Sequence, residues 1–352
     1  MKLLIVTQKV DKQDSVLGFF HRWLQEFAKH CESVIVVCLE KGEHDLPHNV
    51  RVLSLGKEHR ESRIKYVRNF YKYIRHEREN YDAVFVHMNP IYVVLGGLFW
   101  RAWNKKIALW YTHKSVDLKL RLAEKLCNVI FTASKESFRL KSGKVIVTGH
   151  GIDISSFKCQ VSSVKKEGEG KFDILSVGRI SPIKKYEVLI EAVEVLVRDG
   201  IDVRLKIVGG PGTKEQSEYL DSLKKKVKDS GLVEIVQFVG EVSNKDIIEY
   251  LQDADLFVNL SQTGSLDKAV LEAMACGVPV LTSNKGLEST LVDLKDNLMF
   301  DNEDINMLSK KIKSIIDLDQ SERSNFGIKL RSIVVENHNL SKLIKNLVLK
   351  MQ

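Results

Sequence analysis

The sequence predicts an α/β protein of two domains, each a parallel sheet covered by helices. Three observations carry this prediction. Short apolar runs alternate with helical patterns from the first residues onward, which is typical of parallel sheets with right-handed crossovers. The length of 352 residues exceeds the size at which one hydrophobic core usually keeps growing. A polar stretch at residues 161–170 separates the apolar runs into two groups, so it is the expected linker.

The first group of runs predicts a Rossmann-like domain over residues 1–165. Each run is short and apolar, and each is followed by a helical pattern, so the runs are expected to be buried parallel strands. They are residues 3–7, 34–38, 83–87, 107–111, 129–133 and 144–147. A polar loop follows the first strand, and Gly18 then begins the helix at 19–28, where a glycine permits close approach of the backbone.

The second group of runs predicts another Rossmann-like domain, over residues 171–339. Its expected strands are residues 173–177, 204–208, 234–239, 256–259 and 278–282. The composition agrees with two buried cores, since 44% of the residues are hydrophobic. The five cysteines are scattered, odd in number and without metal-ligand spacing, so they are interpreted as reduced core residues and no metal site is expected.

The chain is expected to lie in the cytoplasm. Its first apolar run is too short for a signal peptide and is interpreted as a buried strand. The longest apolar stretch, around residues 91–99, falls well short of the roughly 20 residues that a membrane span needs.

Residues 264–280 form the most informative segment, because an apolar helix is framed there by a polar glycine turn and a Gly-Val-Pro stop. Ser265, Asp267 and the unpaired N–H groups of the first turn predict an anion site. Glu272 lies on the same helix and needs a partner if it is buried, for which a ribose diol is one candidate. An ordinary crossover helix with a solvated Glu272 is the alternative. The expected buried stripe is Val270, Leu271, Met274 and Ala275.

A second segment strengthens the prediction of an anionic ligand. Residues 172–190 contain an apolar strand, a turn at Gly178 and Arg179, a proline at a helix start, and Lys184. Arg179 offers a planar fork and Lys184 a point charge at the carboxyl end of a strand, which suits a diphosphate. A solvated basic loop is the alternative for this segment taken alone.

Together these segments resemble the donor half of glycosyltransferase family 4, which has the two-domain GT-B architecture. Other landmarks agree: the strand at 203–208 with Gly209 and Gly210, and the segments 147–153, 238–243, 254–261 and 271–280. The resemblance covers nearly the whole chain. It implies two sheets facing across a cleft, with the last helix, 340–352, packed back on the first domain. One departure is clear, since the family usually has a glutamate at the position of Gly264.

The resemblance implies roles for residues on both domains. On the second domain, the residues expected to bind the donor are Gly178, Arg179, Lys184, Ser265, Leu266, Asp267 and Glu272. On the first, Gly18 is expected beneath the donor diphosphate, and His113 is expected to reach the donor sugar. Helix capping is the alternative for Asp267, and a structural role is the alternative for Gly18 and for His113.

The implied activity is transfer of a sugar from a nucleoside diphosphate to a hydroxyl acceptor, with retention at the anomeric carbon. His113, Arg179 and Lys184 are the expected catalytic residues, of which Arg179 and Lys184 are fixed donors for the charge that develops on the leaving phosphates. The nucleotide sugar is a substrate, so no cofactor is expected. The expected role is synthesis of polysaccharide, cell-surface glycan or glycolipid. The alternatives are a nucleotide-sugar epimerase of the same architecture and a non-catalytic partner subunit.

The net charge of +8 and the pI near 9.0 predict an anionic partner. Residues 57–78 contain eight Lys or Arg residues with apolar residues at helical spacing, and Trp100 and Trp103 combine with further basic residues nearby. This pattern favours the inner face of a plasma membrane that carries a lipid-linked acceptor. A solvated helix is the alternative. Nucleic acid is not expected, because no recognition module accompanies the charge.

Overall fold

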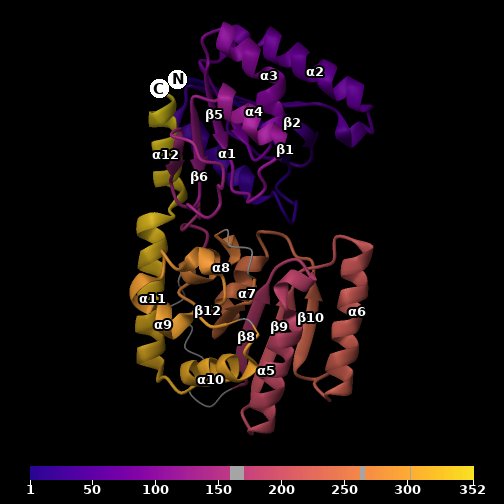
Figure 1. Cartoon of the computed structure of the whole chain (residues 1–352), viewed down its shortest axis with the longest axis vertical. Coiled ribbons are helices and arrows are strands. Elements are labelled where there is room, and N and C mark those ends of the chain that lie inside the picture. Colours follow the sequence, from indigo (N-terminus) through magenta and orange to yellow (C-terminus); the bar gives the residue numbers. More distant parts are fainter. Residues whose placement is uncertain (159–169, 262–265, 302) are drawn as a thin grey trace. The chain divides into compact units, whose positions relative to one another are not determined.

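The computed structural model describes residues 1–158, 170–261, 266–301 and 303–352, which form two compact units (Figure 1). Unit 1 comprises Met1–Asp153 and His338–Gln352, and unit 2 comprises Ile154–Asn337. The division falls before the predicted linker at 161–170, of which residues 161–169 lie outside the described residues. The chain therefore passes from unit 1 to unit 2 and returns for its last helix.

Among the described residues, unit 1 contains a seven-stranded sheet in the order β3-β2-β1-β4-β5-β6-β7, and all neighbouring strands in it are parallel. The strands are β1 (Lys2–Val10), β2 (Ser33–Lys41), β3 (Val50–Ser54), β4 (Ala83–His87), β5 (Lys106–Trp110), β6 (Val129–Thr132) and β7 (Val145–Val147). The helices are α1 (Phe19–His30), α2 (Arg63–His76), α3 (Pro90–Ala102), α4 (Leu118–Leu126) and α12 (Leu340–Met351). Short 3₁₀ turns lie at Lys57–His59 and Arg78–Asn80.

The strands predicted for unit 1 are all present, and β3 is an additional strand. The inner strands are almost completely buried, which explains their uninterrupted apolar runs. Strand β3 lies at the edge of the sheet and its residues are half-buried or exposed, so it lacks such a run. The last helix, α12, packs against α1, where the Ser341 hydroxyl donates a hydrogen bond to the Glu26 carboxylate at 2.6 Å.

Unit 2 contains, within the described residues, a five-stranded parallel sheet in the order β10-β9-β8-β11-β12. The strands are β8 (Phe172–Val177), β9 (Val203–Val208), β10 (Val236–Gly240), β11 (Leu256–Asn259) and β12 (Val280–Thr282). The helices are α5 (Tyr186–Arg198), α6 (Lys214–Asp229), α7 (Ile247–Asp253), α8 (Lys268–Ala275), α9 (Lys295–Leu298), α10 (Ile305–Ile316) and α11 (Gln320–Asn337). Short 3₁₀ turns lie at Pro182–Lys184, Lys285–Leu287 and Val292–Leu294.

Both sheets reverse their strand order beside the first strand of the unit. In unit 1 the chain builds outward from β1 through β2 on one side and through β4 on the other. In unit 2 it builds outward from β8 through β9 on one side and through β11 on the other. The carboxyl ends of the two strands at such a switch point are where open α/β sheets bind ligands. The two units therefore each offer one topologically favoured place for a site.

None of the helices in the described part of the chain is both long enough and apolar enough to span a bilayer.

Candidate functional site

Two glycines let the backbone close tightly at the carboxyl end of β8. Gly178 has φ +154°, and a Cβ there would lie 3.0 Å from Cε of Lys184. Gly209, which follows β9, has φ +137°, and a Cβ there would lie 2.0 Å from the carbonyl oxygen of Gly178. A side chain at either position would therefore collide with its neighbours or strain the backbone. The predicted Gly178 thus has a steric reason to be glycine, and its bare Cα makes room for the side chain of Lys184.

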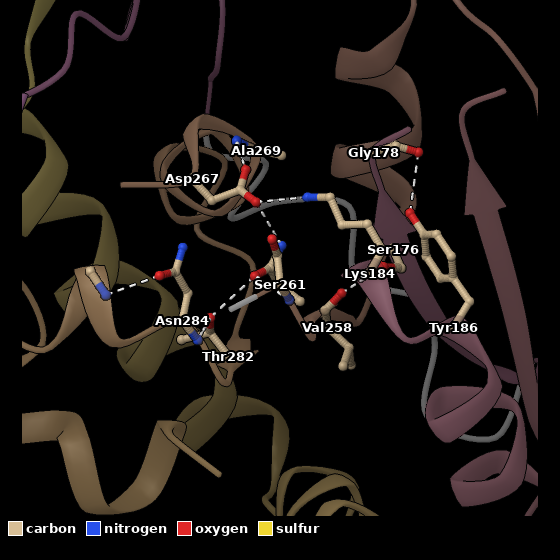
Figure 2. Close-up of polar contacts among 12 residues, drawn as sticks. Ser176, Gly178, Lys184, Tyr186, Val258, Ser261, Asp267, Ala269, Thr282 and Asn284 are labelled. Carbon is tan, nitrogen blue, oxygen red and sulfur yellow. Dashed lines mark hydrogen bonds and ion pairs between the residues drawn. The ribbon is translucent and has the colours of Figure 1, made fainter. Parts of the chain in front are cut away.

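The structure brings Lys184 and Asp267 together across the switch point of unit 2. Lys184 follows β8 and Asp267 follows β11, and these strands are neighbours in the sheet. The Lys184 ammonium donates a hydrogen bond to Oδ2 of Asp267 at 2.9 Å (Figure 2). Each side chain is only 15% exposed, so the pair is poorly screened by water. Two residues that the sequence analysis chose separately therefore form one ion pair.

Further hydrogen bonds fix the carboxylate of Asp267. Oδ2 also accepts from the Asn259 amide at 3.0 Å, and Oδ1 accepts from the backbone N–H of Ala269 at 3.3 Å, which caps α8. Burial alone would raise the pKa of Asp267, but the charge of Lys184 and these hydrogen bonds outweigh burial and lower that pKa below its ordinary value. Asp267 is therefore a fixed anion at neutral pH. Its predicted alternative role as a helix cap is present in the structure alongside the ion pair.

Polar groups beneath the ion pair connect the ends of β8, β11 and β12. The Tyr186 hydroxyl donates to the Gly178 carbonyl at 3.2 Å, and burial raises the pKa of this phenol, which keeps it neutral. Oδ1 of Asn259 accepts from the Thr282 hydroxyl at 3.4 Å (Figure 2). Within the described residues, the buried hydroxyls of Ser261 and Ser283 have no hydrogen-bond partner. This edge of the sheet is therefore polar, and two of its buried hydroxyls form no hydrogen bond within the described part of the protein.

The guanidinium of Arg179, unlike the ammonium of Lys184, is available to a ligand. Its side chain is exposed, and no described residue forms a hydrogen bond or ion pair with its guanidinium. A Cβ on Gly212 would lie 3.8 Å from Cδ and Nε of Arg179, so the arginine extends along the loop after β9. The turn after β8 thus presents one unpaired cation, Arg179, and one paired cation, Lys184.

Glu272 is buried on α8, with 6% of its surface exposed, so the alternative of a solvated Glu272 is wrong. Its carboxylate is paired with the Lys268 ammonium one helical turn earlier. The predicted stripe of Val270, Leu271, Met274 and Ala275 is fully buried, and Leu266 is 7% exposed. Gly264 and Ser265 lie outside the described residues. A ribose partner for Glu272 remains a prediction, because Lys268 supplies one satisfactory partner within the protein.

The predicted residues of unit 1 lie in loops at the carboxyl ends of its strands. Gly18 precedes α1, and a Cβ there would lie 2.4 Å from the carbonyl oxygen of Asp14. Asp14 in turn accepts hydrogen bonds from the N–H groups of Val16 and Leu17 at 2.9 and 2.7 Å, so this loop is firmly built. His113 follows β5 and is exposed, with its ring 6.2 Å from that of Tyr111. These contacts explain on structural grounds why residue 18 is a glycine. The functional role of His113 stays a prediction.

The switch point of unit 1 holds His87, which the sequence analysis missed. His87 ends β4, is 2% exposed and stacks on Phe20 with ring centroids 4.0 Å apart. The Thr7 hydroxyl on β1 lies 3.3 Å from its Nδ1. Burial lowers the pKa of His87 to about 3, so the imidazole is neutral. The available signal was a polar residue at the end of a predicted apolar strand.

One expectation about the surface of unit 1 is wrong. Trp100 was predicted to contribute to a membrane-facing surface, but it is 0% exposed and its Nε1 donates to the Tyr81 hydroxyl at 3.1 Å. Helix α3 is apolar on most of its surface, and Trp100 lies on the side that packs into the core. The exposed apolar residues of this helix are instead Leu98 and Phe99, at 70% and 46%.

The described residues contain no group of three His, Cys, Asp or Glu side chains arranged to hold a metal ion.

Comparison with known families identifies the class to which the chain belongs. Residues 160–332 match the family described as glycosyl transferases group 1. The matched residues include both sides of the unit 2 switch point, with Arg179, Lys184, Asp267 and Glu272. Unit 2 therefore matches the group 1 glycosyltransferase family over most of its length.

Individual relatives agree over part of their length. Mannosylfructose-phosphate synthase of Agrobacterium fabrum is 36% identical over 149 residues, which are 41% of this chain and 33% of the relative. D-inositol 3-phosphate glycosyltransferase 2 of Catenulispora acidiphila is 29% identical over 160 residues, which are 43% and 37% of the two chains. Spore coat protein SA of Bacillus subtilis is 28% identical over 187 residues, or 51% and 48%. The chain thus spans about a third to a half of the length of these relatives.

Solved structures match over the whole fold. Anabaena Alr3699/HepE in complex with UDP has a TM-score of 0.79 at 18% identity, with 100% of this chain and 99% of that chain covered. Sucrose-phosphate synthase from Thermosynechococcus elongatus has a TM-score of 0.75 at 16% identity, with 99% and 98% covered. At these identities the likeness establishes the fold. The predicted GT-B class, with two Rossmann-like α/β domains, is confirmed.

Proposed function

We propose that this protein is a retaining glycosyltransferase that moves a sugar from a nucleoside diphosphate to a hydroxyl acceptor. The observation that carries the proposal is the pair of basic residues after β8, Arg179 and Lys184, which lie at the switch point beside the start of α8. A diphosphate is the ligand that this arrangement suits, because a planar fork, a point charge and a helix N-terminus all favour phosphate oxygens. The group 1 family match covers these same residues.

Electrostatic stabilisation is the proposed source of catalysis. When the sugar leaves, negative charge develops on the diphosphate, and Arg179 and Lys184 are already in place to receive it. Fixed donors need no reorganisation at that moment, and the low exposure of Lys184 strengthens its interaction. The proposed reaction uses the nucleotide sugar as a substrate and requires no resident cofactor. The UDP bound by the Anabaena protein supports a uridine donor as the first to test.

Other predicted residues have proposed supporting roles. Glu272 accepts hydrogen bonds from the ribose, while Ser265, Leu266 and Asp267 open the helix that faces the phosphates. For Gly18 and His113 of unit 1, the proposed roles are those that the sequence resemblance implies. Because Gly264 replaces the usual glutamate, the contact to the sugar differs from that of the family, which leaves the identity of the sugar to the donor screen.

A screen of UDP, GDP and ADP sugars tests the proposal and separates it from its alternatives. We expect one nucleotide to raise the melting temperature, since a ligand at 100 times its dissociation constant adds about 2.7 kcal/mol. Nucleoside diphosphate should then form only when an acceptor hydroxyl is supplied. An epimerase would instead convert the donor sugar with no acceptor present. A non-catalytic subunit would release no nucleoside diphosphate with any acceptor.

The acceptor is proposed to be carried by an anionic membrane, in keeping with a role in surface glycan or glycolipid synthesis. Helix α2 is strongly basic, with Arg63, Arg68 and Arg75 exposed along it. Exposed apolar residues accompany this charge, with Ile64 on α2 at 82% and Phe99 on α3, whose ring lies 5.6 Å from that of Tyr71. Each basic residue near an anionic surface contributes about 1 kcal/mol before screening.

Co-sedimentation with vesicles of increasing anionic lipid content tests this attachment. Binding should rise with anionic lipid, fall with salt, and weaken when Arg63, Arg68, Arg75 and Arg78 are changed to Gln. The matched control changes four exposed lysines of α6 to Gln, which removes the same amount of positive charge from another helix. These lysines are Lys214, Lys224, Lys225 and Lys228. Equal weakening by both sets would show that only net charge matters, and binding indifferent to lipid charge and salt would contradict attachment.

A further inference from the structure

The inference concerns the Lys184–Asp267 ion pair, and it rests on the proposed donor site. Lys184 is one of two cations proposed to hold the diphosphate, yet in the structure its ammonium is already bonded to Asp267 at 2.9 Å. The side chain passes close to the bare Cα of Gly178, because Cε and Nζ would lie only 3.0 and 3.1 Å from a Cβ there. A phosphate that approaches Lys184 therefore meets an ammonium that is shared with a carboxylate.

Asp267 is held too firmly to move aside. Asn259, at the end of β11, donates to Oδ2 at 3.0 Å, and the first turn of α8 donates to Oδ1 through Ala269 at 3.3 Å. Asn259 is itself 2% exposed and bonded to Thr282 on β12. The carboxylate is thus held by the end of β11 and by α8, so a ligand at Lys184 must share the ammonium with it. Figure 2 shows the bonds of Asp267 to Lys184 and Ala269.

Helix capping does not account for this arrangement. A cap requires one acceptor oxygen, and Oδ1 alone meets that need. Ser, Thr or Asn at this position would cap α8 as well without introducing a charge. The second oxygen, Oδ2, instead faces Lys184 across the switch point and Asn259 at the end of β11.

The charges near the proposed diphosphate therefore do not sum to two positive groups. Arg179 and Lys184 each contribute one positive charge, and Asp267 subtracts one. We propose that Asp267 is a built-in counter-anion for Lys184, which shares the ammonium with the bound ligand and so weakens the hold of the site on the nucleoside diphosphate product. Such a device favours release of the product, a step that often limits turnover.

The test is the affinity of the full-length protein for UDP, measured by calorimetry with dissociation followed by stopped flow. GDP or ADP replaces UDP if the donor screen selects it. Asp267→Asn and Asp267→Ser both retain a capping oxygen and lose the charge. Each should bind UDP about tenfold more tightly, mainly through slower dissociation. The matched control is Asp319→Asn, which removes an exposed carboxylate that caps α11 in the same unit and should leave UDP affinity unchanged.

A double-mutant cycle with Lys184→Met decides whether Asp267 acts through Lys184. The gain in UDP affinity from Asp267→Asn should be larger with Lys184 present than in the Lys184→Met background. The reason is that the substitution frees an ammonium only when Lys184 is there to provide one. Equal gains in both backgrounds would mean that the carboxylate acts on the diphosphate directly, and unchanged or weaker binding by Asp267→Asn and Asp267→Ser would also overturn the inference. A parent protein that binds none of UDP, GDP and ADP would instead contradict the proposed function itself.

Discussion

The two units share a topology at their switch points but fill them with opposite chemistry. In unit 2 the ends of β8 and β11 carry Lys184 and Asp267, which form a buried ion pair beside the unpaired Arg179. In unit 1 the ends of β1 and β4 carry Thr7 and the neutral His87, packed among aromatic rings. The same backbone arrangement therefore carries an ion pair in one unit and a packed neutral core in the other. Topology indicates where a site is favoured, and the side chains decide whether one is built.

The largest expected effect comes from the two basic residues of unit 2. Arg179→Ala and Lys184→Ala should each lower turnover by about 100- to 1000-fold, because they remove a donor aimed at charge that develops in the transition state. Steady-state kinetics with the selected donor and acceptor measure this loss. Arg198→Ala, at the exposed end of α5, is the matched control and should retain parental turnover. Parental turnover in both Arg179→Ala and Lys184→Ala would contradict the catalytic role proposed for the unit 2 switch point.

The next effect concerns stability and tests the structural role of the unit 1 switch point. The pKa of His87 falls from 6.5 to about 3 on folding, so between these pH values the unfolded chain binds a proton that the native protein does not. Stability contributed by the neutral imidazole is therefore complete above pH 6.5 and is lost as the pH falls, at a limiting slope of about 1.4 kcal/mol per pH unit.

Urea unfolding of the parent and of His87→Gln between pH 7 and pH 4 measures that slope. The variant lacks the titrating group, so its stability should depend less steeply on pH than that of the parent. His113→Gln is the matched control, because His113 is exposed and follows the adjacent strand. Identical pH dependence in the parent and His87→Gln would contradict a buried neutral imidazole.

A smaller effect is expected at Glu272. If Glu272 binds the ribose, Glu272→Gln should weaken nucleotide affinity by about tenfold, since a hydrogen bond to a charged group is replaced by a neutral one. Lys268→Met sharpens the test, because it breaks the Lys268–Glu272 pair and leaves the carboxylate in place. Calorimetry should show weaker nucleotide binding by Glu272→Gln than by Lys268→Met. Equal losses would assign the effect to the ion pair within α8.

The sequence was sufficient to predict the two-domain fold and the segments that form the unit 2 site. Buried parallel strands have continuous apolar runs, and β8 and β11 were recognised from them. The Lys184–Asp267 contact was not predictable from these patterns, because the residues are 83 positions apart and meet only through the order of the strands. Asn259 was missed because its partners are Asp267, in the loop after β11, and Thr282, on the neighbouring strand β12.

Other features were not predicted, because the hydrophobic periodicity of their segments carries little information. Strand β3 lies at an edge and is partly exposed, so its five residues have no distinctive run. Helix α3 is apolar around most of its circumference, so the pattern did not show that Trp100 faces the core. His87 resembled any polar residue at the end of a strand, and only its burial and its stacking on Phe20 distinguish it.

Hydrogen exchange of the whole chain with and without a saturating nucleoside diphosphate tests the central claim most directly, because it reports both units at once. UDP is the first probe. The account predicts that UDP slows exchange of the amides at 178–185 and 266–272, on the two sides of the unit 2 switch point, and that Arg179→Ala abolishes this protection at the same UDP concentration. Saturating UDP that leaves both segments unprotected, while it protects others, would contradict the assignment of the donor site.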